Sequence, residues 1–281
     1  MDIYVVIPVF NRLDHTKKII KCLRRQTIYH KLKLVVVNDG SSDGTDIWLK
    51  KQLDINTING NGYLFWGGAV NLALKKIFKF CKILDWVLLI NNDVEIKENY
   101  VEYLLEIAKK NYPAAVGSIV KNNEDKIISV GPRILTKSLE INDLLLDDSI
   151  FYNSELVKNV DALSGRGVLY SVKSLKKVEG LRSKIFPHYF SDYDLSLRIK
   201  RKGYSLILSR EIVVYTDENF ELIKKERKRK SIFFKLFSKK SSSLFFAKFF
   251  FWWEASNNLE RISLPLRIIL FIILPALRKA L

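Results

Sequence analysis

Cysteine and histidine are scarce in this chain of 281 residues, which holds two of the former and three of the latter. Cys22 and Cys81 lie far apart and lack the spacing of metal ligands, so neither a disulfide framework nor a cysteine zinc site is expected. The apolar stretch IYVVIPVF follows Met1 without a basic segment or a small-residue cleavage site, so it predicts a first strand rather than a signal segment. These absences favour the reducing cytosol.

The sequence also lacks internal repeats, a Walker A loop and a GxGxxG loop. Its last apolar stretch, Leu264–Leu277, is interrupted by Pro265, Arg267 and Pro275. A membrane-spanning helix needs about 20 mostly apolar residues. A P-loop, a repeat architecture and a spanning helix at this position are therefore not expected.

Charge is unevenly distributed along the chain. Residues are 48% hydrophobic and 12% aromatic, as in folded proteins, and the net charge is +17. From Lys224 to Leu281 there are 14 Lys or Arg and 3 Asp or Glu, so this part alone contributes +11. The composition predicts a main domain over residues 1–220 and a basic, aromatic-rich helical tail over residues 221–281.

The main domain alternates strand-like and helix-like patterns. Strands are expected at 3–9, 32–37, 55–58, 85–91 and 114–120, and helices at 14–27, from about 43, at 68–80 and at 98–110. Such alternation predicts an α/β fold with a mostly parallel sheet and helices on both faces. Ligands bind such sheets beyond the carboxyl ends of the strands.

The pattern is weaker after residue 120. Residues 121–160 are irregular and polar and have no assignment, and 160–172 suggest a return strand beside a Gly-Arg-Gly loop. A helix over 192–203, ending at Gly203, and two short strands at 204–208 and 212–215 are expected to follow.

Two strands end in polar residues that suit a ligand site. The buried run in VLLINNDVE stops at Asn91-Asn92-Asp93, where a carboxylate at a strand end is typical of a Mg²⁺ or Mn²⁺ site. The second strand stops at Asn38-Asp39-Gly40, where an acidic residue can bind a nucleobase or ribose. Both segments are also ordinary turns, and Ser42 or Asp43 would cap the next helix.

Two further segments admit a functional and a structural interpretation. In NGNGYLFWGGAVNLALK, glycines at a helix start favour phosphate binding, whereas an aromatic core cluster with a flexible turn is the alternative. In HYFSDYDLSLRIKRKGY, Ser191 and Asp194 have capping-box spacing, and Asp192 in the first turn suits either the helix dipole or a general base.

Together, these segments resemble the family 2 glycosyltransferases with the GT-A fold. Five motifs occur in the order of that family and cover about residues 1–217: VVIPVFNR, VVVNDGSSDGT, INNDVEI at the DxD position, SGRGVLYS and FSDYDLSLRIKRKGY. LFWGGAVN resembles a variant found in bacterial polysaccharide transferases of the family, including rhamnosyltransferase-like members.

The resemblance implies a role for each matching residue. Asp39 is expected to contact the base of a UDP- or dTDP-type donor, Asp93 to bind the divalent cation at the diphosphate, and Asp192 to be the base of an inverting transfer. Gly165, Arg166 and Gly167 are expected near the donor sugar and the acceptor. The other residues expected at the donor are Pro8, Val9, Asn11, Trp66, Gly67, Asn71 and Asn92.

The residue types agree with this chemistry. A diphosphate leaving group needs a cation or dipoles to stabilise its charge, and the attacking hydroxyl needs a base. A covalent enzyme intermediate is unnecessary, so the missing Ser/His/Asp or Cys/His constellation is no obstacle. Of the three histidines, His188 is the candidate to face the site, and the alternative is that a lone histidine is a structural or surface residue.

Three positions depart from the family pattern. The DxD position has one carboxylate, Asp93, so metal binding is expected to depend on the phosphates of the donor. The usual Glu-Asp pair before the helix is Ser191-Asp192. Thr216 and Asp217 follow the late strand, where many members have a metal-binding histidine.

The tail combines basic and aromatic residues. Residues 224–240 carry 9 Lys or Arg and 1 Glu, and a helix after them would place Phe245, Phe249, Trp252 and Trp253 on one face, with Phe246 and Phe250 beside them. This composition suits a helix in a membrane interface with anionic lipids. We therefore expect a peripheral protein on the inner face of the cell membrane, with a lipid-linked glycan acceptor.

Three alternatives remain open at this stage. The tail suits a helical dimerisation or packing element, and its basic run suits nucleic-acid binding. That second role is not expected, because no RRM, KH or helix-turn-helix pattern accompanies the run. A sugar nucleotidyltransferase on the same fold would need a glycine-rich basic loop after the first strand, and IPVFNRLDH has none.

Overall fold

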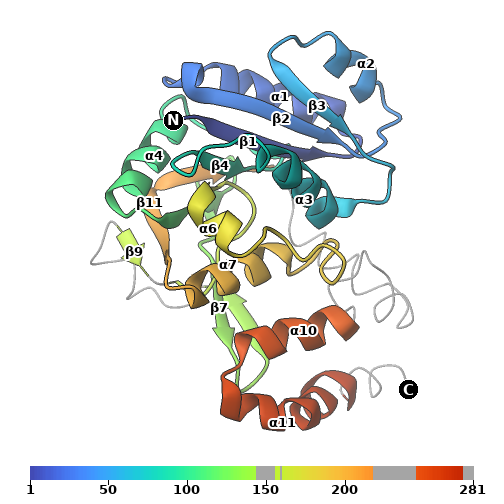
Figure 1. Cartoon of the computed structure of the whole chain (residues 1–281), viewed down its shortest axis with the longest axis vertical. Coiled ribbons are helices and arrows are strands. Elements are labelled where there is room, and N and C mark those ends of the chain that lie inside the picture. Colours follow the sequence, from blue (N-terminus) through green and yellow to red (C-terminus); the bar gives the residue numbers. More distant parts are fainter. Residues whose placement is uncertain (144–155, 159, 218–244, 275–281) are drawn as a thin grey trace.

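A computed structural model describes residues 1–143, 156–158, 160–217 and 245–274 of the chain (Figure 1). Its strands are β1 (Ile3–Val9), β2 (Leu32–Asn38), β3 (Ile55–Asn59), β4 (Trp86–Leu89), β5 (Ala114–Lys121), β6 (Ile127–Ser129), β7 (Pro132–Leu135), β8 (Glu140–Asp143), β9 (Leu156–Lys158), β10 (Val168–Ser171) and β11 (Ser205–Tyr215). Its α-helices are α1 (Leu13–Arg24), α2 (Thr45–Lys50), α3 (Phe65–Ile77), α4 (Tyr100–Lys110), α6 (Val172–Lys177), α7 (Ser191–Arg201), α10 (Phe245–Ala255) and α11 (Asn258–Ile268). Two short elements complete the set, the 3-10 turn η1 (Tyr29–Lys31) and the π-helical turn η3 (Ile269–Ile273).

A mostly parallel sheet forms the centre of the molecule, as the alternating patterns predict. Its strand order is β3-β2-β1-β4-β10-β5-β11-β9, and β6 pairs with β5. The neighbours β1, β2, β3 and β4 run parallel, as do β5 and β11, whereas β10 is antiparallel to both β4 and β5. The return strand therefore inserts into the middle of the sheet, and its first residue lies at the edge where the parallel strands end.

Helices cover both faces of this sheet. Alternate residues of β1 separate into two cores, with Ile3 and Val5 in the core under α1 and α4, and Tyr4 and Val6 in the core under α3 and α7. Strands buried on both faces need near-continuous apolar runs, which is why IYVVIPV and WVLL have no polar alternation. The predicted fold class is confirmed.

Late in the main domain the structure differs from one expectation and gives elements to a segment that had no assignment. The segments 204–208 and 212–215 are one strand, β11, which pairs with β5 on both sides of an irregularity between Leu208 and Val213. A bulge absorbs the polar residues between them without ending the ladder. The unassigned segment 121–160 contributes β6, the hairpin β7–β8 and β9, with residues 144–155 and 159 outside the described part.

The capping box expected at α7 is wrong. Phe190, in a left-handed conformation at φ 66°, is the N-cap, and Ser191 is already the first helical residue. Within the described residues, Ser191 Oγ is buried and accepts no hydrogen bond. Asp194 instead receives hydrogen bonds from Arg182 and Arg198. Gly203, with φ +81°, follows the helix end as expected.

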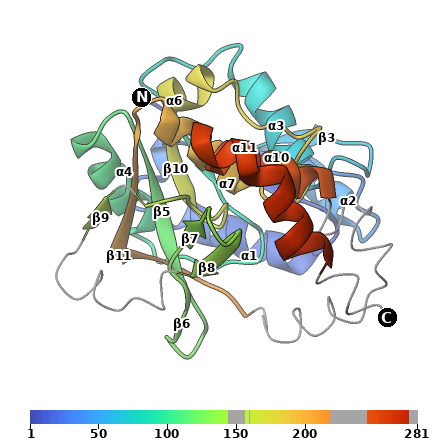
Figure 2. The same ribbon diagram turned by 90° about the horizontal axis from the view of Figure 1, so that it is seen from below.

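The C-terminal helices pack on the main domain through one face of α10. Phe251 stacks on Phe190 with ring centroids 4.8 Å apart, and Trp252 is buried beside it. In Figure 1, α10 and α11 lie below α7 and beside the β7–β8 hairpin, and in Figure 2, seen from below, they lie in front of α7. The aromatic face expected on α10 is divided between core and surface: Trp252 is buried, whereas Trp253, which stacks on Phe249 with ring centroids 6.1 Å apart, is exposed.

Among the described residues, no helix is both long and apolar enough to cross a membrane. The basic segment 224–240 and the predicted boundary near residue 220 lie outside the described part of the chain.

Candidate active site

The polar strand ends predicted from the sequence meet at one edge of the sheet. β1, β2 and β4 are parallel, so residues 9–12, 38–40 and 91–93 emerge side by side. The antiparallel β10 starts at the same edge, which brings Gly165, Arg166 and Gly167 there as well. This edge is the natural ligand site of such a sheet.

Asn11 joins the loops that follow β1 and β2. Its backbone N–H donates to Ser41 Oγ (2.8 Å), and its side-chain oxygen accepts from the backbone N–H of Ser42 (2.9 Å). Val9 is buried beneath them and its carbonyl accepts from the N–H of Asp39 (2.8 Å), while Pro8 is half-buried. Pro8, Val9 and Asn11, which were predicted to contact the donor, therefore form the base of the site and do not project into solvent.

Asp39 anchors the loop that leads into α3. One carboxylate oxygen accepts from the N–H of Gly62 (2.8 Å), and the other accepts from Leu64 (2.9 Å) and Phe65 (3.1 Å). A carboxylate has about four acceptor positions, so one remains for a ligand donor group. The expected contact with a base stays a prediction, and the structure adds a scaffold role.

The turn after Asp39 is not capped as expected. Gly44, not Ser42 or Asp43, is the N-cap of α2. Asp43, one residue earlier, still accepts from the N–H of Thr45, the first residue of α2 (3.2 Å), and its other oxygen accepts from the N–H of Leu13 (2.8 Å), which ties this turn to the start of α1.

An open hollow lies beside Asp39, at the ends of β2 and β3. It is lined by glycines and by polar or charged residues: Asn38, Gly40, Ser41, Asp46, Lys50, Thr57, Asn59 and Gly60. Hydroxyl, amide and backbone groups of this kind suit the hydrogen-bonding edge of a base or ribose.

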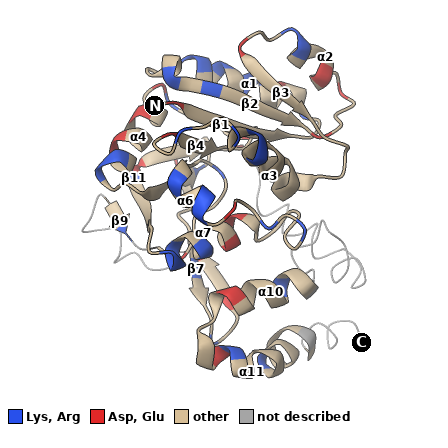
Figure 3. Cartoon of the chain, viewed as in Figure 1, with Lys and Arg blue, Asp and Glu red and all other residues tan. Residues whose placement is uncertain are grey.

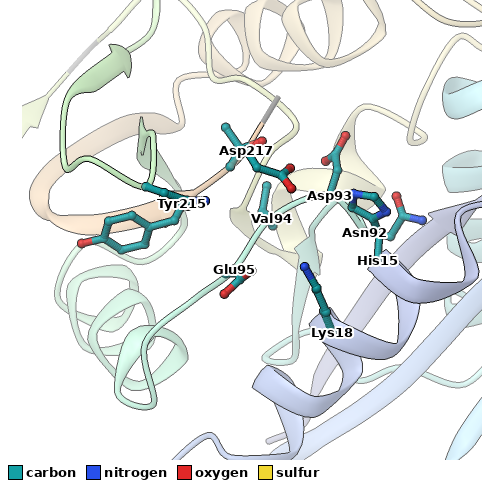
Figure 4. Close-up of a pocket in the computed structure, with 10 residues that line it drawn as sticks. His15, Lys18, Asn92, Asp93, Val94, Glu95, Tyr215 and Asp217 are labelled. Carbon is teal, nitrogen blue, oxygen red and sulfur yellow. The ribbon is translucent and has the colours of Figure 1, made fainter. Parts of the chain in front are cut away.

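The side chains of Asn92 and Asp93, just after β4, point to opposite sides of the chain. Asn92 points under the site and donates to Thr16 Oγ1 (3.1 Å) on α1, and it is buried. Asp93 lies on the other side, where its Oδ2 accepts from Arg12 Nη1 (2.9 Å). Figure 4 shows the Asp93 side chain at a small hollow that His15 and Asp217 also line.

Asp93 fits a cation only in part. Its Oδ1 is buried, and no hydrogen-bond partner reaches it within the described residues, as expected of an atom that awaits a ligand. In that same part of the chain, no group of three or more His, Cys, Asp or Glu is arranged to hold a metal ion. A cation on Asp93 would therefore need the phosphates of a donor for its remaining oxygens.

Trp66 connects the end of β4 to the Gly165 loop. Its Nε1 donates to Asn91 Oδ1 (2.8 Å). A Cβ added at Gly165 would lie 2.5 Å from the Trp66 ring and 3.5 Å from Asp192 Cβ, so only glycine lets the indole and Asp192 come this close. A continuous set of contacts thus runs from Asp192 through Trp66 to Asn91, two residues before Asp93.

Gly67 and Asn71 face away from this set. A Cβ at Gly67 would lie 2.5 Å from the Phe186 carbonyl oxygen, so close packing against the loop before α7 explains the glycine. Asn71 donates to Ser183 Oγ (3.3 Å). His188 stacks edge-on against Tyr189, with 4.6 Å between the ring centroids. Roles for Gly67 and Asn71 at the donor stay predictions.

Asp192 occupies the first turn of α7, at the mouth of the Gly165 loop. Its Oδ2 accepts from the N–H of Gly165 (2.8 Å) and its Oδ1 from the N–H of Tyr193 (3.0 Å). Burial raises the pKa of this carboxyl, and the two N–H groups and the charge of Arg166 oppose that rise. A carboxyl with a raised pKa is a stronger base once ionised, as proton abstraction requires.

Gly167 is the last residue of the Gly165 loop, and its surroundings leave no space for a side chain. Its φ is +110°, and a Cβ there would collide with the Tyr100 hydroxyl. Its carbonyl accepts from Ser118 Oγ (2.7 Å), and Ser118 lies 2.7 Å from that same Tyr100 hydroxyl. This network holds Arg166, the preceding residue, at the sheet edge.

Sequence reasoning missed three residues near Asp93. Arg12 pairs with Asp93, and His15 and Lys18 line the hollow beside it. For His15 and Lys18 the available signal was their spacing of three on α1, which places them on one face, whereas the pairing of Arg12 with Asp93 had no such signal.

The comparisons with known proteins agree with this geometry. The sequence model described as glycosyl transferase family 2 matches residues 4–178, more than half of the chain. This chain belongs to glycosyl transferase family 2. A comparison with curated protein sequences gave no match.

Solved structures show that this family 2 chain has the GT-A fold. GalNAc-T7, solved with UDP, GalNAc and Mn²⁺, is 10% identical at a TM-score of 0.62 over 77% of this chain and 44% of its own. TarS from S. aureus is 17% identical at 0.55 over 81% and 38%. The mannosyltransferase PcManGT from Pyrobaculum calidifontis, solved with GDP-Man and Mn²⁺, is 14% identical at 0.58 over 99% and 82%. The chain spans less than half the length of the first two.

Proposed function

We propose that this glycosyltransferase moves a sugar, with inversion, from a UDP- or dTDP-type donor to a hydroxyl of a lipid-linked glycan in surface polysaccharide assembly. The observation that carries the proposal is the set of contacts joining Asp192, Trp66 and Asn91 at the sheet edge next to Asp93. It supplies a half-buried base on one side and a carboxylate for a cation on the other. The resemblance of LFWGGAVN to polysaccharide transferases favours this acceptor class.

Each residue has a chemical task in this reaction. Asp192 takes the proton of the acceptor hydroxyl as its oxygen attacks the anomeric carbon, and Trp66 offers an apolar face on which a sugar ring can lie. A divalent cation held by Asp93 would neutralise charge on the leaving diphosphate. Arg166 lies close enough to Asp192 to affect its pKa and adds positive charge at the same place.

A nucleotide-binding panel tests the proposal. Isothermal titration with UDP, dTDP, GDP and CDP, with and without Mn²⁺, should give binding of one pyrimidine diphosphate that Mn²⁺ strengthens. Asp93→Asn should remove the effect of Mn²⁺, and the matched exposed change Asp14→Asn should not. Preference for GDP, the nucleotide bound by PcManGT, would refute the pyrimidine assignment, and binding of no nucleotide would refute the function.

The exposed faces of α10 and α11 support placing this enzyme on the inner face of the cell membrane. Leu259 and Ile262 are each 80% exposed, and Figure 3 shows both helices mostly uncharged, with a few Lys, Arg and Glu residues on each. The large apolar side chains exposed on this surface are Phe246, Phe250, Trp253, Leu259, Ile262, Leu266, Ile269, Leu270, Phe271 and Leu274. Such a patch, in a tail whose sequence also contains a run of Lys and Arg, suits an anionic bilayer.

Vesicle flotation tests this attachment. We expect binding to vesicles of phosphatidylglycerol and phosphatidylcholine, and weaker binding to phosphatidylcholine alone. The variant Leu259→Glu/Ile262→Glu/Leu266→Glu should bind at least about 10-fold more weakly, because burying each such side chain contributes about 1.5–3 kcal/mol. The control Ile47→Glu/Leu53→Glu changes equally exposed apolar residues of the main domain and should bind normally. Equal loss in both variants would contradict the assignment.

A further inference from the structure

The ion pair between Arg12 and Asp93 places a positive group on the carboxylate expected to hold the cation. Arg12 Nη1 lies 2.9 Å from Asp93 Oδ2, and the two side chains are 48% and 10% exposed. The pair thus leaves only Oδ1 for a metal ion. A guanidinium this close also repels a second positive charge at the same carboxylate.

The backbone is strained at the position that presents Arg12. Asn11 and Arg12 are consecutive non-glycine residues with φ of 57° and 63°. Asparagine tolerates this left-handed conformation, but arginine rarely adopts it, and such strain persists only where the surroundings impose it. The turn directs the chain from β1 back across the sheet edge toward the end of β4.

Hydrogen bonds from both sides hold this turn. The Arg12 carbonyl accepts from the N–H and the Oγ1 of Thr16 (3.0 and 3.1 Å). Thr16 Oγ1 in turn accepts from Asn92, the residue before Asp93. One network therefore fixes the backbone of Arg12 and the backbone beside its partner, which indicates that the ion pair is a built feature of the site.

Nearly half of the Arg12 side chain is exposed, so a ligand at the sheet edge can reach it. Arginine binds phosphate oxygens through paired N–H donors, and a nucleoside diphosphate carries several such oxygens and more negative charge than one carboxylate. A diphosphate next to Asp93 would offer Arg12 a better partner. When Arg12 moves to the diphosphate, Asp93 Oδ2 becomes free to bind the cation.

We propose that Arg12 is an exchangeable counterion of Asp93, which moves to the donor diphosphate and thereby makes metal binding depend on donor binding. This inference rests on the proposed nucleotide-sugar donor. It explains how a site with one carboxylate at the DxD position excludes a free cation yet accepts one together with its substrate. Coupling between the two ligands must be reciprocal.

Mn²⁺ titrations followed by electron paramagnetic resonance test the proposal without any turnover. With no nucleotide present, the wild-type enzyme should bind Mn²⁺ weakly, and Arg12→Gln should bind it about 10-fold more tightly because a neighbouring positive charge is gone. UDP or dTDP binding without metal should weaken in Arg12→Gln by a similar factor. Arg12→Lys, which keeps the charge, should leave Mn²⁺ binding weak.

Two controls separate this inference from the proposed function. Lys18→Gln removes a positive charge that lines the same hollow and should change Mn²⁺ binding much less than Arg12→Gln. Thermal melting verifies that each variant folds. Unchanged or weaker Mn²⁺ binding in Arg12→Gln would overturn the role of Arg12, even if nucleotide binding is normal. Absence of nucleotide binding in every protein, including wild type, would instead refute the proposed function, and the Mn²⁺ result would still decide the counterion.

Discussion

Replacing Asp192 by asparagine is expected to lower the rate of sugar transfer about 10²–10⁴-fold, the usual contribution of a positioned general base. Asparagine keeps the size of the side chain and one acceptor for the N–H of Gly165 or Tyr193, but it cannot take a proton. In the proposed function the donor nucleotide binds at other residues, so its dissociation constant should change little. Steady-state kinetics and nucleotide titration on the same preparation separate the two effects.

The pH profile gives a second measure of Asp192. A base must be ionised to act, so the rate should rise with pH through its pKa and level off above it. Because burial raises this pKa above that of an ordinary aspartate, the acidic limb should lie at higher pH than a normal aspartate would give. The limb should disappear in Asp192→Asn. If the variant keeps most of its activity, or if the limb persists, another group is the base.

The ends of the parallel strands were the most predictable part of the site. Asn38-Asp39-Gly40 and Asn91-Asn92-Asp93 each follow an uninterrupted apolar run, and parallel pairing necessarily brings such ends together. The pattern therefore brought these polar residues to one edge of the sheet without any knowledge of side-chain contacts, and their role in ligand binding stays a prediction.

Side-chain partners were not predictable, because they depend on distant segments. Asp39 meets the N–H groups of Gly62 and Leu64 only after β3 has been added beside β2. The capping spacing of Ser191 and Asp194 was a valid local pattern, but two arginines from the tertiary structure bind Asp194 more favourably than a cap would. Tertiary charge pairing overrode local propensity there.

The pairing of Arg12 with Asp93 could not be predicted from the spacing of residues in the sequence. Asp93 is 81 residues away, and the left-handed turn that aims Arg12 is unusual for arginine. Neither property has a short-range signature. The inward face of α10 likewise depends on Phe190, which lies in another element and is itself in an unusual conformation.

Asp194 lies at the centre of a buried charge cluster near the site. It is fully buried and is bound by Arg182 and Arg198, and Arg182 also contacts Glu254 of α10 (2.8 Å). The guanidinium of Arg198, at 12% exposure, also donates to the carbonyls of Val178 (2.6 Å) and Gly180 (2.7 Å). It therefore stays buried when its carboxylate partner is lost.

Replacing Asp194 by alanine is thus expected to lower the free energy of unfolding by about 3–5 kcal/mol, the cost of leaving a buried charge unpaired. The melting temperature should fall by on the order of 10 °C for a chain of this size. Thermal and urea unfolding followed by circular dichroism measure both quantities.

Asp192→Asn is the matched control, since the two carboxylates lie two residues apart on α7. Because burial disfavours the charge of Asp192, neutralising it should leave the stability unchanged or raise it. Asp192→Asn should therefore lose activity and keep its stability, while Asp194→Ala should lose stability first and activity only as a consequence. If Asp194→Ala melts like the wild type, the two arginines gain little from this carboxylate, and the link it makes between α7 and α10 does not hold the catalytic helix in place.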